Sequence, residues 1–389
     1  MRRVFKWAFR AVLLLALVVG GMAIWKRDDI TRLLAVNSLF DEDRIVSNFS
    51  GFDGLFFSTP LDIPEGPPSP LPANPLEMPD ISDWVAQRAV TALVVLKDGE
   101  IAHESYYLGT SDTDLRISWS VAKSFLSALM GIVLEEGDIA SIDDPVTKYA
   151  PALKGGAYDG ASIRNVLNMA SGVRFNEDYL DFNSDINKMG RVLALGGSMD
   201  EFAAGLSEKN REPGVAWQYV SIDTHVLGMV IRGATGRSIP ELMVEKLLAP
   251  LGLEAAPYYV TDGSGVAFVL GGLNLRTRDY ARLGQMFLQN GMWNGEQLVP
   301  ASWVAASTVS SAPDLPGDVG YGFQWWMPAD TETGEYFARG VYGQYIYISP
   351  RANVVIALNS ADRGFTEAGV NQQNIDMFRM IAAQVGAAE

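Results

Sequence analysis

The sequence predicts an α/β (α+β) fold in which strands near both ends of the main domain enclose a helical middle. Alternating apolar residues at 91–97 and 101–107, separated by Asp98-Gly99, indicate a β-hairpin. The middle, from about 140 to 300, is mostly helical by period. The remaining alternating segments, which can join the hairpin in one antiparallel sheet before a final helix at 371–385, are 322–327, 335–339, 344–349 and 353–359.

Length and composition restrict the possible classes of protein. A chain of 389 residues that is 48% hydrophobic can bury a large core, so we expect one unit of two lobes with an N-terminal appendage. The net charge of −16 argues against nucleic-acid partners. Because the chain has no cysteine, disulfides, a cysteine nucleophile and thiolate metal sites are all excluded.

The first residues predict a signal anchor over 1–27. Basic residues up to Arg10 precede an uncharged stretch at 11–25, and such a positive flank stays in the cytoplasm while the rest of the chain is exported. Gly21-Met22-Ala23 would pass as a cleavage site, but the segment stays apolar beyond it, so an uncleaved anchor is favoured. We therefore expect an inner-membrane, single-pass protein with its main domain in the periplasm.

Residues 28–82 are predicted to form a proline-rich tether, and residues 83–389 the main domain. The run 63–75 contains six prolines and cannot sustain helix or sheet, so it should lie extended over the surface. Phe52, Leu55, Phe56 and Phe57 before it are apolar enough to dock on the main domain or on the membrane.

Ser120 and Lys123 are the candidate nucleophile and base. They precede an apolar run at helical spacing that ends at Gly137, so they should share one face of the first turn of a buried helix. A hydroxyl needs a neighbour that takes its proton, and an apolar setting near a helix N-terminus favours the neutral amine of a lysine. Ser-x-x-Lys also arises by chance, so a surface pair without chemistry is the alternative; the hairpin before it and the apolar helix after it favour catalysis.

Three motifs together resemble the serine β-lactamase and penicillin-binding-protein superfamily. The resemblance is strongest to its class C-like branch, which holds family VIII esterases and 6-aminohexanoate-dimer hydrolases, and it runs from about residue 85 to the C-terminus. It implies an antiparallel sheet flanked by terminal helices and packed on an all-helical lobe, with the active site between them. The motifs are Ser120-Val-Ala-Lys123, Tyr219-Val-Ser221 and the run 271–284.

The same resemblance assigns a role to Tyr219. In class C-like relatives the matching tyrosine belongs to the proton relay, which a nearby cation can support by lowering the tyrosine pKa. The alternative is a tyrosine that only packs beside Trp217. Ser221 stands where many relatives have asparagine, so the side-chain amide that helps to hold a β-lactam is missing.

The third motif of the superfamily, a lysine or histidine followed by Thr or Ser and Gly, is absent. The matching region, Arg339-Gly-Val-Tyr-Gly-Gln-Tyr345, resembles the form found in esterase and amide-hydrolase relatives. Gly343, Gln344 and Tyr345 are therefore predicted to bind substrate, and a backbone N–H near Gln344 or Tyr345 should complete the oxyanion hole with that of Ser120. Because the missing cation normally binds the carboxylate of penicillins, its loss argues against those substrates.

Other polar residues give weaker signals. Tyr179, within the carboxylate-rich segment 177–181, is expected to border the substrate cleft, although such segments are more often solvated turns. His103 and His225 are far apart in the sequence and lack metal-ligand spacing, so we expect no metal. No cofactor is implied.

The sequence thus predicts an exported serine hydrolase that cleaves a small carboxylic ester or linear amide through an acyl-enzyme on Ser120. Two alternatives stay open at this point. One is a β-lactamase or D,D-peptidase on the same fold, and the other is a non-catalytic periplasmic binding module.

Overall fold

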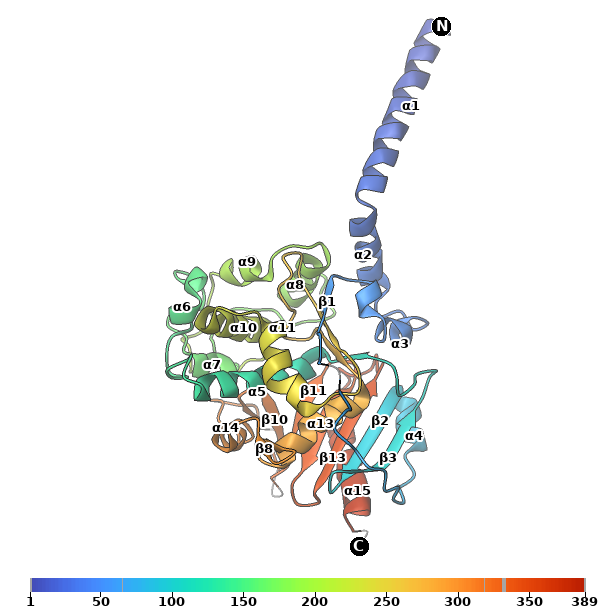
Figure 1. Ribbon diagram of the computed structural model, residues 1–389. Helices are drawn as coiled ribbons and strands as arrows, with labels where there is room; N and C mark the ends of the chain where they lie inside the picture. Colours follow the sequence, from blue (N-terminus) through green and yellow to red (C-terminus); the bar gives the residue numbers. More distant parts are fainter. Residues whose placement is uncertain (1, 65, 318, 331–333, 388–389) are drawn as a thin grey trace.

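The computed structural model describes residues 2–64, 66–317, 319–330 and 334–387. Its centre is a seven-stranded antiparallel sheet of order β3-β2-β13-β12-β11-β10-β9, which joins strands from both ends of the main domain (Figure 1). The predicted hairpin and C-terminal strand region are confirmed. The strands are β2 (Val90–Lys97), β3 (Glu100–Tyr106), β9 (Val319–Gly322), β10 (Trp325–Pro328), β11 (Tyr336–Gly340), β12 (Gln344–Ser349) and β13 (Val354–Ser360).

One predicted strand is wrong. The segment 322–327 is not continuous, because Phe323 and Gln324 form the turn between β9 and β10, with Gly322 opposite Trp325. Both turn residues are left-handed, with φ of 39° and 72°. Left-handed residues at both central positions suit a tight hairpin, but Phe and Gln rarely occupy them, so the sequence carried no turn signal.

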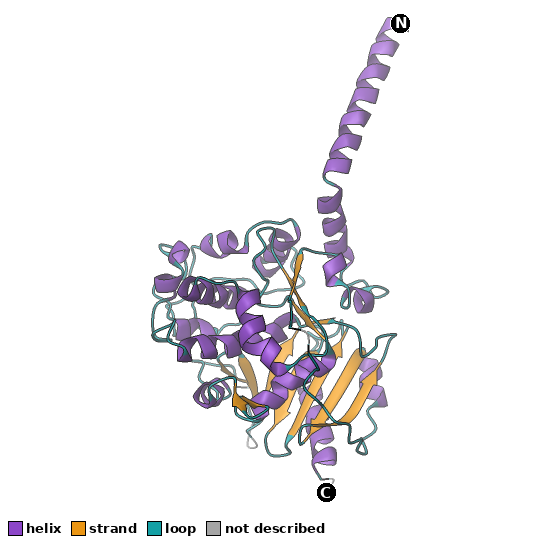
Figure 2. Ribbon diagram, viewed as in Figure 1, coloured by secondary structure: helices purple, strands orange, loops and turns teal. Residues whose placement is uncertain are grey.

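Helices cover both faces of the large sheet (Figure 2). α15 (Val370–Gly386) and α4 (Ser82–Gln87) pack on one face, where Trp84 contacts Phe378 edge-on. The predicted final helix is therefore confirmed. On the other face lies α13 (Thr277–Leu288), whose Gly284 comes so close to Val355 and Ile346 that no side chain fits between them.

The residues between the terminal strands form a helical lobe around α5 (Ala122–Glu135) and α10 (Ser221–Thr235), both of which are buried for most of their length. The prediction of a mostly helical middle is confirmed, although it also contains short strands, which are too brief to show a period. The other helices are α6 (Val146–Tyr149), α7 (Ile163–Leu167), α8 (Asp185–Ala194), α9 (Met199–Ala204), α11 (Ile239–Met243), α12 (Ala249–Leu251) and α14 (Ala301–Ser307).

A small four-stranded sheet lies where the two lobes meet. It has the order β1-β5-β6-β4 and takes its first strand from the N-terminal segment. Its strands are β1 (Ser58–Pro60), β4 (Arg116–Ile117), β5 (Tyr258–Val260) and β6 (Leu273–Leu275), and a separate hairpin consists of β7 (Met292–Trp293) and β8 (Glu296–Gln297).

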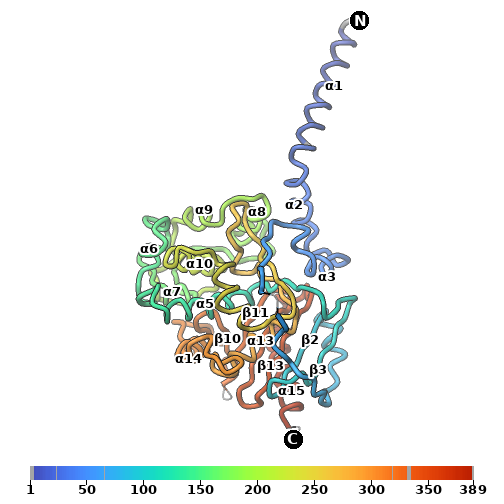
Figure 3. Tube along the Cα trace, viewed as in Figure 1, coloured from blue at the N-terminus to red at the C-terminus, as the bar shows by residue number. Residues whose placement is uncertain are grey.

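The chain begins with α1 (Arg2–Trp25), which projects away from the rest of the molecule (Figure 1). Its Val4–Met22 stretch is long and apolar enough to cross a membrane, features that a signal sequence would share. α2 (Arg27–Ser38) comes after Lys26, and α3 (Ile45–Asn48) after a short loop. Figure 3 traces this segment, in blue, onto the body of the protein and then toward β2.

The segment predicted as a tether is packed on the main domain. Phe49, Phe52 and Leu61 belong to its hydrophobic core and are at most 4% exposed. The proline-rich part is held at Ser69, whose hydroxyl accepts hydrogen bonds from Trp293 and Asn294. A boundary at residue 83 stays a prediction, but residues 39–61 complete the core of the folded domain.

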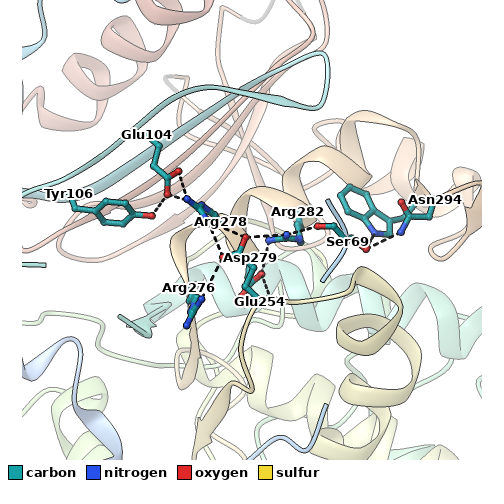
Figure 4. A network of polar contacts seen from close by, with 10 residues as sticks. Ser69, Glu104, Tyr106, Glu254, Arg276, Arg278, Asp279, Arg282 and Asn294 are labelled. Atoms are coloured by element: carbon teal, nitrogen blue, oxygen red, sulfur yellow. Dashed lines mark hydrogen bonds and ion pairs between the residues drawn. The ribbon is translucent and has the colours of Figure 1, made fainter. Parts of the chain in front are cut away.

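Ser69 is also one end of a buried polar network (Figure 4). Its carbonyl accepts a hydrogen bond from Arg282, which pairs with Asp279 at 2.9 Å and with Glu254 at 3.3 Å. Arg278 extends the network to Glu104 on β3. Burial raises the pKa of Asp279 to about 7. Because α13 contributes both arginines, this helix connects the proline-rich segment, the helical lobe and the large sheet.

Candidate active site

Ser120 lies where the small sheet passes into α5. β4 ends at Ile117, and a 3₁₀ turn, Trp119–Val121, leads directly into the helix. Trp119 has a left-handed φ of 43°, an unfavourable conformation for a bulky residue. The Ser118 amide donates to the Leu273 carbonyl at 2.8 Å, which attaches the turn to β6. Ser120 is thereby held at the start of a rigid, buried helix with its side chain at a cavity wall.

Lys123, in the first turn of α5, is 2% exposed. Its amine donates to the Leu270 carbonyl at 2.9 Å and lies 5.5 Å from the centre of the Tyr219 ring. Burial lowers the pKa of Lys123 to about 7, and this shift is opposed by the negative charges of Glu177 and Asp223. Near neutral pH, a large fraction of the amine therefore has the lone pair that a general base needs.

Tyr219 lies beside Ser120, and their side chains are hydrogen-bonded. Its ring stacks on Trp326, with centroids 5.5 Å apart. Burial raises the pKa of Tyr219 above its ordinary value, and the hydrogen bond with Ser120 only partly opposes this. Arg339 also lowers the pKa of Tyr219, but desolvation outweighs it, so Tyr219 is a neutral phenol that can pass a proton but is not a ready base.

A carboxylate approaches the same group of residues. Glu177 accepts from the Ser221 amide at 3.0 Å and from the Ser221 hydroxyl, so it caps the N-terminus of α10 from 44 positions away in the sequence. Tyr179 donates at 2.9 Å to Oε1 of Glu177, the same oxygen that accepts from the Ser221 hydroxyl. Burial raises the pKa of Glu177, and its hydrogen bonds with Ser221 oppose the shift. The sequence predicts that the segment containing Glu177 borders the cleft, but it does not predict which groups would donate hydrogen bonds to this carboxylate.

A second buried carboxyl, that of Asp223, interacts electrostatically with Lys123. Asp223 on α10 is fully buried and accepts from the Tyr158 hydroxyl at 2.8 Å. Burial raises the pKa of Asp223 to about 8. Because the acid is mostly neutral at pH 7, Asp223 adds little negative charge to hold Lys123 protonated, and Glu177 is the main charge that opposes the lowering of the Lys123 pKa.

The strand that replaces the third motif reaches the site at Gly340. A Cβ on Gly340 would lie 3.0 Å from the Ser120 amide nitrogen, so only glycine permits this approach. The next two residues, Val341 and Tyr342, line the cavity. The backbone beside Ser120 therefore comes from Gly340, four to five residues before the predicted Gln344 and Tyr345.

Gly343, Gln344 and Tyr345 are not brought to the cavity. Gly343 shapes the β11–β12 turn with a φ of 83°. The Gln344 side chain is 2% exposed and donates to backbone carbonyls, including that of Ser360 at 2.8 Å. Tyr345 points to the opposite face of the sheet, where it packs on Phe378. Neighbouring residues of a strand point to opposite faces of the sheet, so Gln344 and Tyr345 could not both face the cavity.

The cavity in front of Ser120 has a volume of about 550 Å³ and a mainly apolar lining. Tyr179 and Ser221, both predicted to bind substrate, are at its wall. The N-terminal segment supplies another wall, which includes Leu33 and Val36 of α2 and Phe40 after it. Phe40 stacks on Tyr342, with ring centroids 4.6 Å apart. The sequence offered only the apolar character of residues 52–57 as a signal for this contribution.

The two histidines are held in structural contacts. His225 is 1% exposed and bonds Asp200 at 2.8 Å, and His103 bonds Ser105 at 3.0 Å. Within the described residues, no group of three or more His, Asp or Glu side chains is arranged to hold a metal ion.

A serine at the start of a buried helix, set between a helical lobe and an antiparallel sheet, is the arrangement of the penicillin-recognising type of serine hydrolase. The chain belongs to the Beta-lactamase family, whose model matches residues 81–376. The predicted resemblance is therefore confirmed, and the protein is a serine hydrolase, which removes the binding-module alternative.

Individual relatives agree with this assignment. The chain is 30% identical over 307 residues to the 6-aminohexanoate-dimer hydrolase of Paenarthrobacter ureafaciens, an alignment that covers 75% of this chain and 78% of that protein. A Bacillus anthracis structure described as a candidate 6-aminohexanoate-dimer hydrolase superposes with a TM-score of 0.80 at 23% identity, covering 88% of this chain and 95% of that one. A candidate β-lactamase from Bacteroides dorei gives 0.63 at 23% identity, with 78% and 97% covered.

Proposed function

We propose that the protein is an exported serine hydrolase that cleaves a carboxylic ester or linear amide through an acyl-enzyme on Ser120. Lys123 takes the proton of the Ser120 hydroxyl as the Oγ attacks the carbonyl carbon. The tetrahedral intermediate collapses, the bond to the leaving alcohol or amine breaks, and Tyr219 passes the proton to that group. Water then attacks the acyl-enzyme, which releases the acid and regenerates Ser120.

The observation that carries this proposal is the state of Lys123. Its amine is buried in the turn directly after Ser120, and its pKa is lowered to about 7. A lysine that only supported the fold would be expected to meet a buried anion, but the nearby Asp223 has a raised pKa of about 8. The lone pair of a neutral amine is what the activation of serine requires.

The oxyanion hole would combine the Ser120 amide with a backbone N–H at Val341. Support comes from the close approach of Gly340 to the Ser120 nitrogen and from the position of Val341 at the cavity wall. Two fixed backbone donors stabilise the developing negative charge without reorganisation during the reaction.

Esters and linear amides are preferred over β-lactams in this proposal. The C-terminal strands contain neither lysine nor histidine to bind a β-lactam carboxylate, and the relative that is 30% identical is a linear-amide hydrolase by name. Within the cavity lining, Arg191 is the one charged side chain among the described residues.

The location of the domain is part of the proposal. Basic residues precede the apolar Val4–Met22 helix, a pattern that leaves the N-terminus in the cytoplasm and exports the chain beyond the helix. We therefore place the catalytic domain on the periplasmic side of the inner membrane, held by α1.

The experiment that tests the activity compares three reactions of the detergent-solubilised full chain. A fluorophosphonate probe should label the parent but not Ser120→Ala, and p-nitrophenyl butyrate or a linear amide should turn over much faster than nitrocefin. Labelling that persists in Ser120→Ala would rule out Ser120 as the nucleophile. Nitrocefin turnover comparable to ester turnover would instead favour the β-lactamase alternative.

A further inference from the structure

We infer that the substrate is a membrane-resident amphiphile whose long acyl chain enters the cavity from the bilayer past α2. This inference rests on the proposed function and names its substrate class. The juxtamembrane helix next to the anchor is at the same time a wall of the cavity that contains Ser120.

The anchor helix and the helix of the cavity wall are separated by one residue, Lys26, whose φ of −98° and ψ of 13° interrupt the helical geometry. The Lys26 amide donates to Met22 at 2.8 Å and the Ile30 amide donates to Lys26 at 2.9 Å, so helical hydrogen bonding still continues across the junction. Leu33 and Val36 therefore lie roughly 12 to 17 Å beyond Trp25, at 1.5 Å per residue. The headgroup layer of a bilayer is roughly 5 to 8 Å thick, so the cavity begins just outside it.

α2 is attached to the catalytic domain at the mouth of the cavity. The Arg32 side chain donates to the carbonyl of Ala194 at 2.9 Å, at the end of α8, and its guanidinium lies 4.0 Å from the centre of the Phe57 ring. These contacts hold the α2 wall against the α8 wall, which contributes Met189 and Leu193 to the lining.

The mouth carries exposed apolar side chains that a freely soluble enzyme would not be expected to show to water. Leu180 and Phe182, which line the cavity, are 86% and 67% exposed, and Leu34 on the outer side of α2 is 62% exposed. Apolar groups gathered beside a membrane helix fit contact with lipid.

The lining fits an acyl chain better than a cationic substrate. No carboxylate lies among the described lining residues, so an ammonium group would find no counter-ion, and each buried methylene gains about 0.8 kcal/mol. In the proposed reaction the acyl chain stays along α2 and α8, the carbonyl meets Ser120, and the ester C–O bond breaks. The alcohol leaves with the Ser120 proton, and water later releases the fatty acid.

The first test is chain length, measured on the full chain in detergent with 4-methylumbelliferyl butyrate and decanoate. Because 0.8 kcal/mol per methylene is roughly fourfold in rate, kcat/KM should be at least tenfold higher for decanoate. Val36→Asp, which places a carboxylate in the wall, should lower the decanoate-to-butyrate ratio at least tenfold. The matched control is Thr31→Asp, which adds the same charge at an exposed position of α2 outside the cavity lining, and it should keep the ratio within twofold.

The second test asks where the substrate comes from. The full chain is reconstituted in phosphatidylcholine vesicles, and 4-methylumbelliferyl oleate is placed either in the same vesicles or in separate ones. Hydrolysis should be at least tenfold faster when enzyme and ester share a bilayer. Equal rates, or decanoate turned over no better than butyrate, would overturn the inference while butyrate turnover and probe labelling preserved the proposed function. Absence of labelling and of all ester turnover would overturn both.

Discussion

The Lys123 amine donates to the Leu270 carbonyl and lies against the Tyr219 ring, in surroundings that exclude water. The depressed pKa of Lys123 determines how the stability of the protein changes with pH. The native state binds fewer protons than the unfolded chain between about pH 7 and 10.5, so the destabilisation caused by burying this amine is fully present below pH 7 and disappears as the pH rises through that window. The same deprotonation makes the amine available to Ser120.

Activity is therefore expected to rise with pH along one ionisation with a midpoint near 7, the pKa of Lys123. Lys123→Arg keeps the charge but cannot release its proton, so acylation should fall about 10³-fold. The measurements are kcat/KM for p-nitrophenyl butyrate between pH 5.5 and 9 and the rate of probe labelling, with circular dichroism as the control for folding. A folded arginine variant within tenfold of the parent would contradict the assignment of the base.

Glu177 provides a finer test, because its negative charge raises the pKa of Lys123. Glu177→Gln removes that charge, so the pKa of Lys123 should fall and the activity midpoint should move to lower pH. Glu208→Gln is the control, since Glu208 pairs with Arg174 on the surface. A merely structural role for Glu177 would lower the rate at every pH and leave the midpoint unchanged.

At the scale of elements, α13 depends on a close approach to the large sheet. A Cβ at Gly284 would lie 2.5 Å from Val355 Cγ1 and 2.7 Å from Ile346 Cγ2, so the helix or the strands would have to shift. Both contacts belong to adjacent central strands, β12 and β13, whose positions are fixed by pairing on each side.

Gly284→Ala should therefore destabilise the protein by about 1–2 kcal/mol, because overpacking outweighs the gain in helix propensity. Gly190→Ala in α8, where nothing lies within 4 Å of the new Cβ, is the matched control and should be neutral or stabilising. Thermal melts of both variants in the same detergent provide the comparison. A Gly284→Ala protein as stable as the control would show that α13 is less closely packed than described.

At the scale of the whole molecule, the helix α1 is the part that suits contact with a lipid bilayer. α1 is exposed over the side chains that the structure describes, and it contacts α2. An apolar helix of this kind is stable in a bilayer and unfavourable in water, because its side chains have no protein surface to cover them.

The full chain is therefore expected in the membrane fraction, resistant to carbonate extraction and digestible by protease added to the periplasmic side. Leu14→Arg, at the middle of Val4–Met22, should weaken insertion by about 2.5–3.5 kcal/mol and reduce the membrane-bound share. Leu108→Arg, an exposed position on the main domain, is the control. Recovery of a soluble product that begins near Ile24 would show that the N-terminal helix is a cleaved signal and not an anchor.

Local patterns in the sequence were sufficient for the main elements. The strands β2, β12 and β13 are short apolar runs buried on both faces, and the helix α15 has apolar residues at helical spacing, so these elements could be predicted without knowledge of their partners. The predicted pairing of Ser120 with Lys123 rests on a spacing of three residues, which places two side chains on one face of a helix.

Tertiary structure alone decided the remaining features, because they depend on groups that are far apart in the sequence. The pKa of Lys123 comes from burial beneath Tyr219 and α10, and Glu177 meets Ser221 only when the lobe is folded. The backbone near Ser120 is that of Gly340 rather than that of Gln344, because the register of the strands decides which residue reaches the site. The wall supplied by α2 results from docking on α8, which no local period encodes.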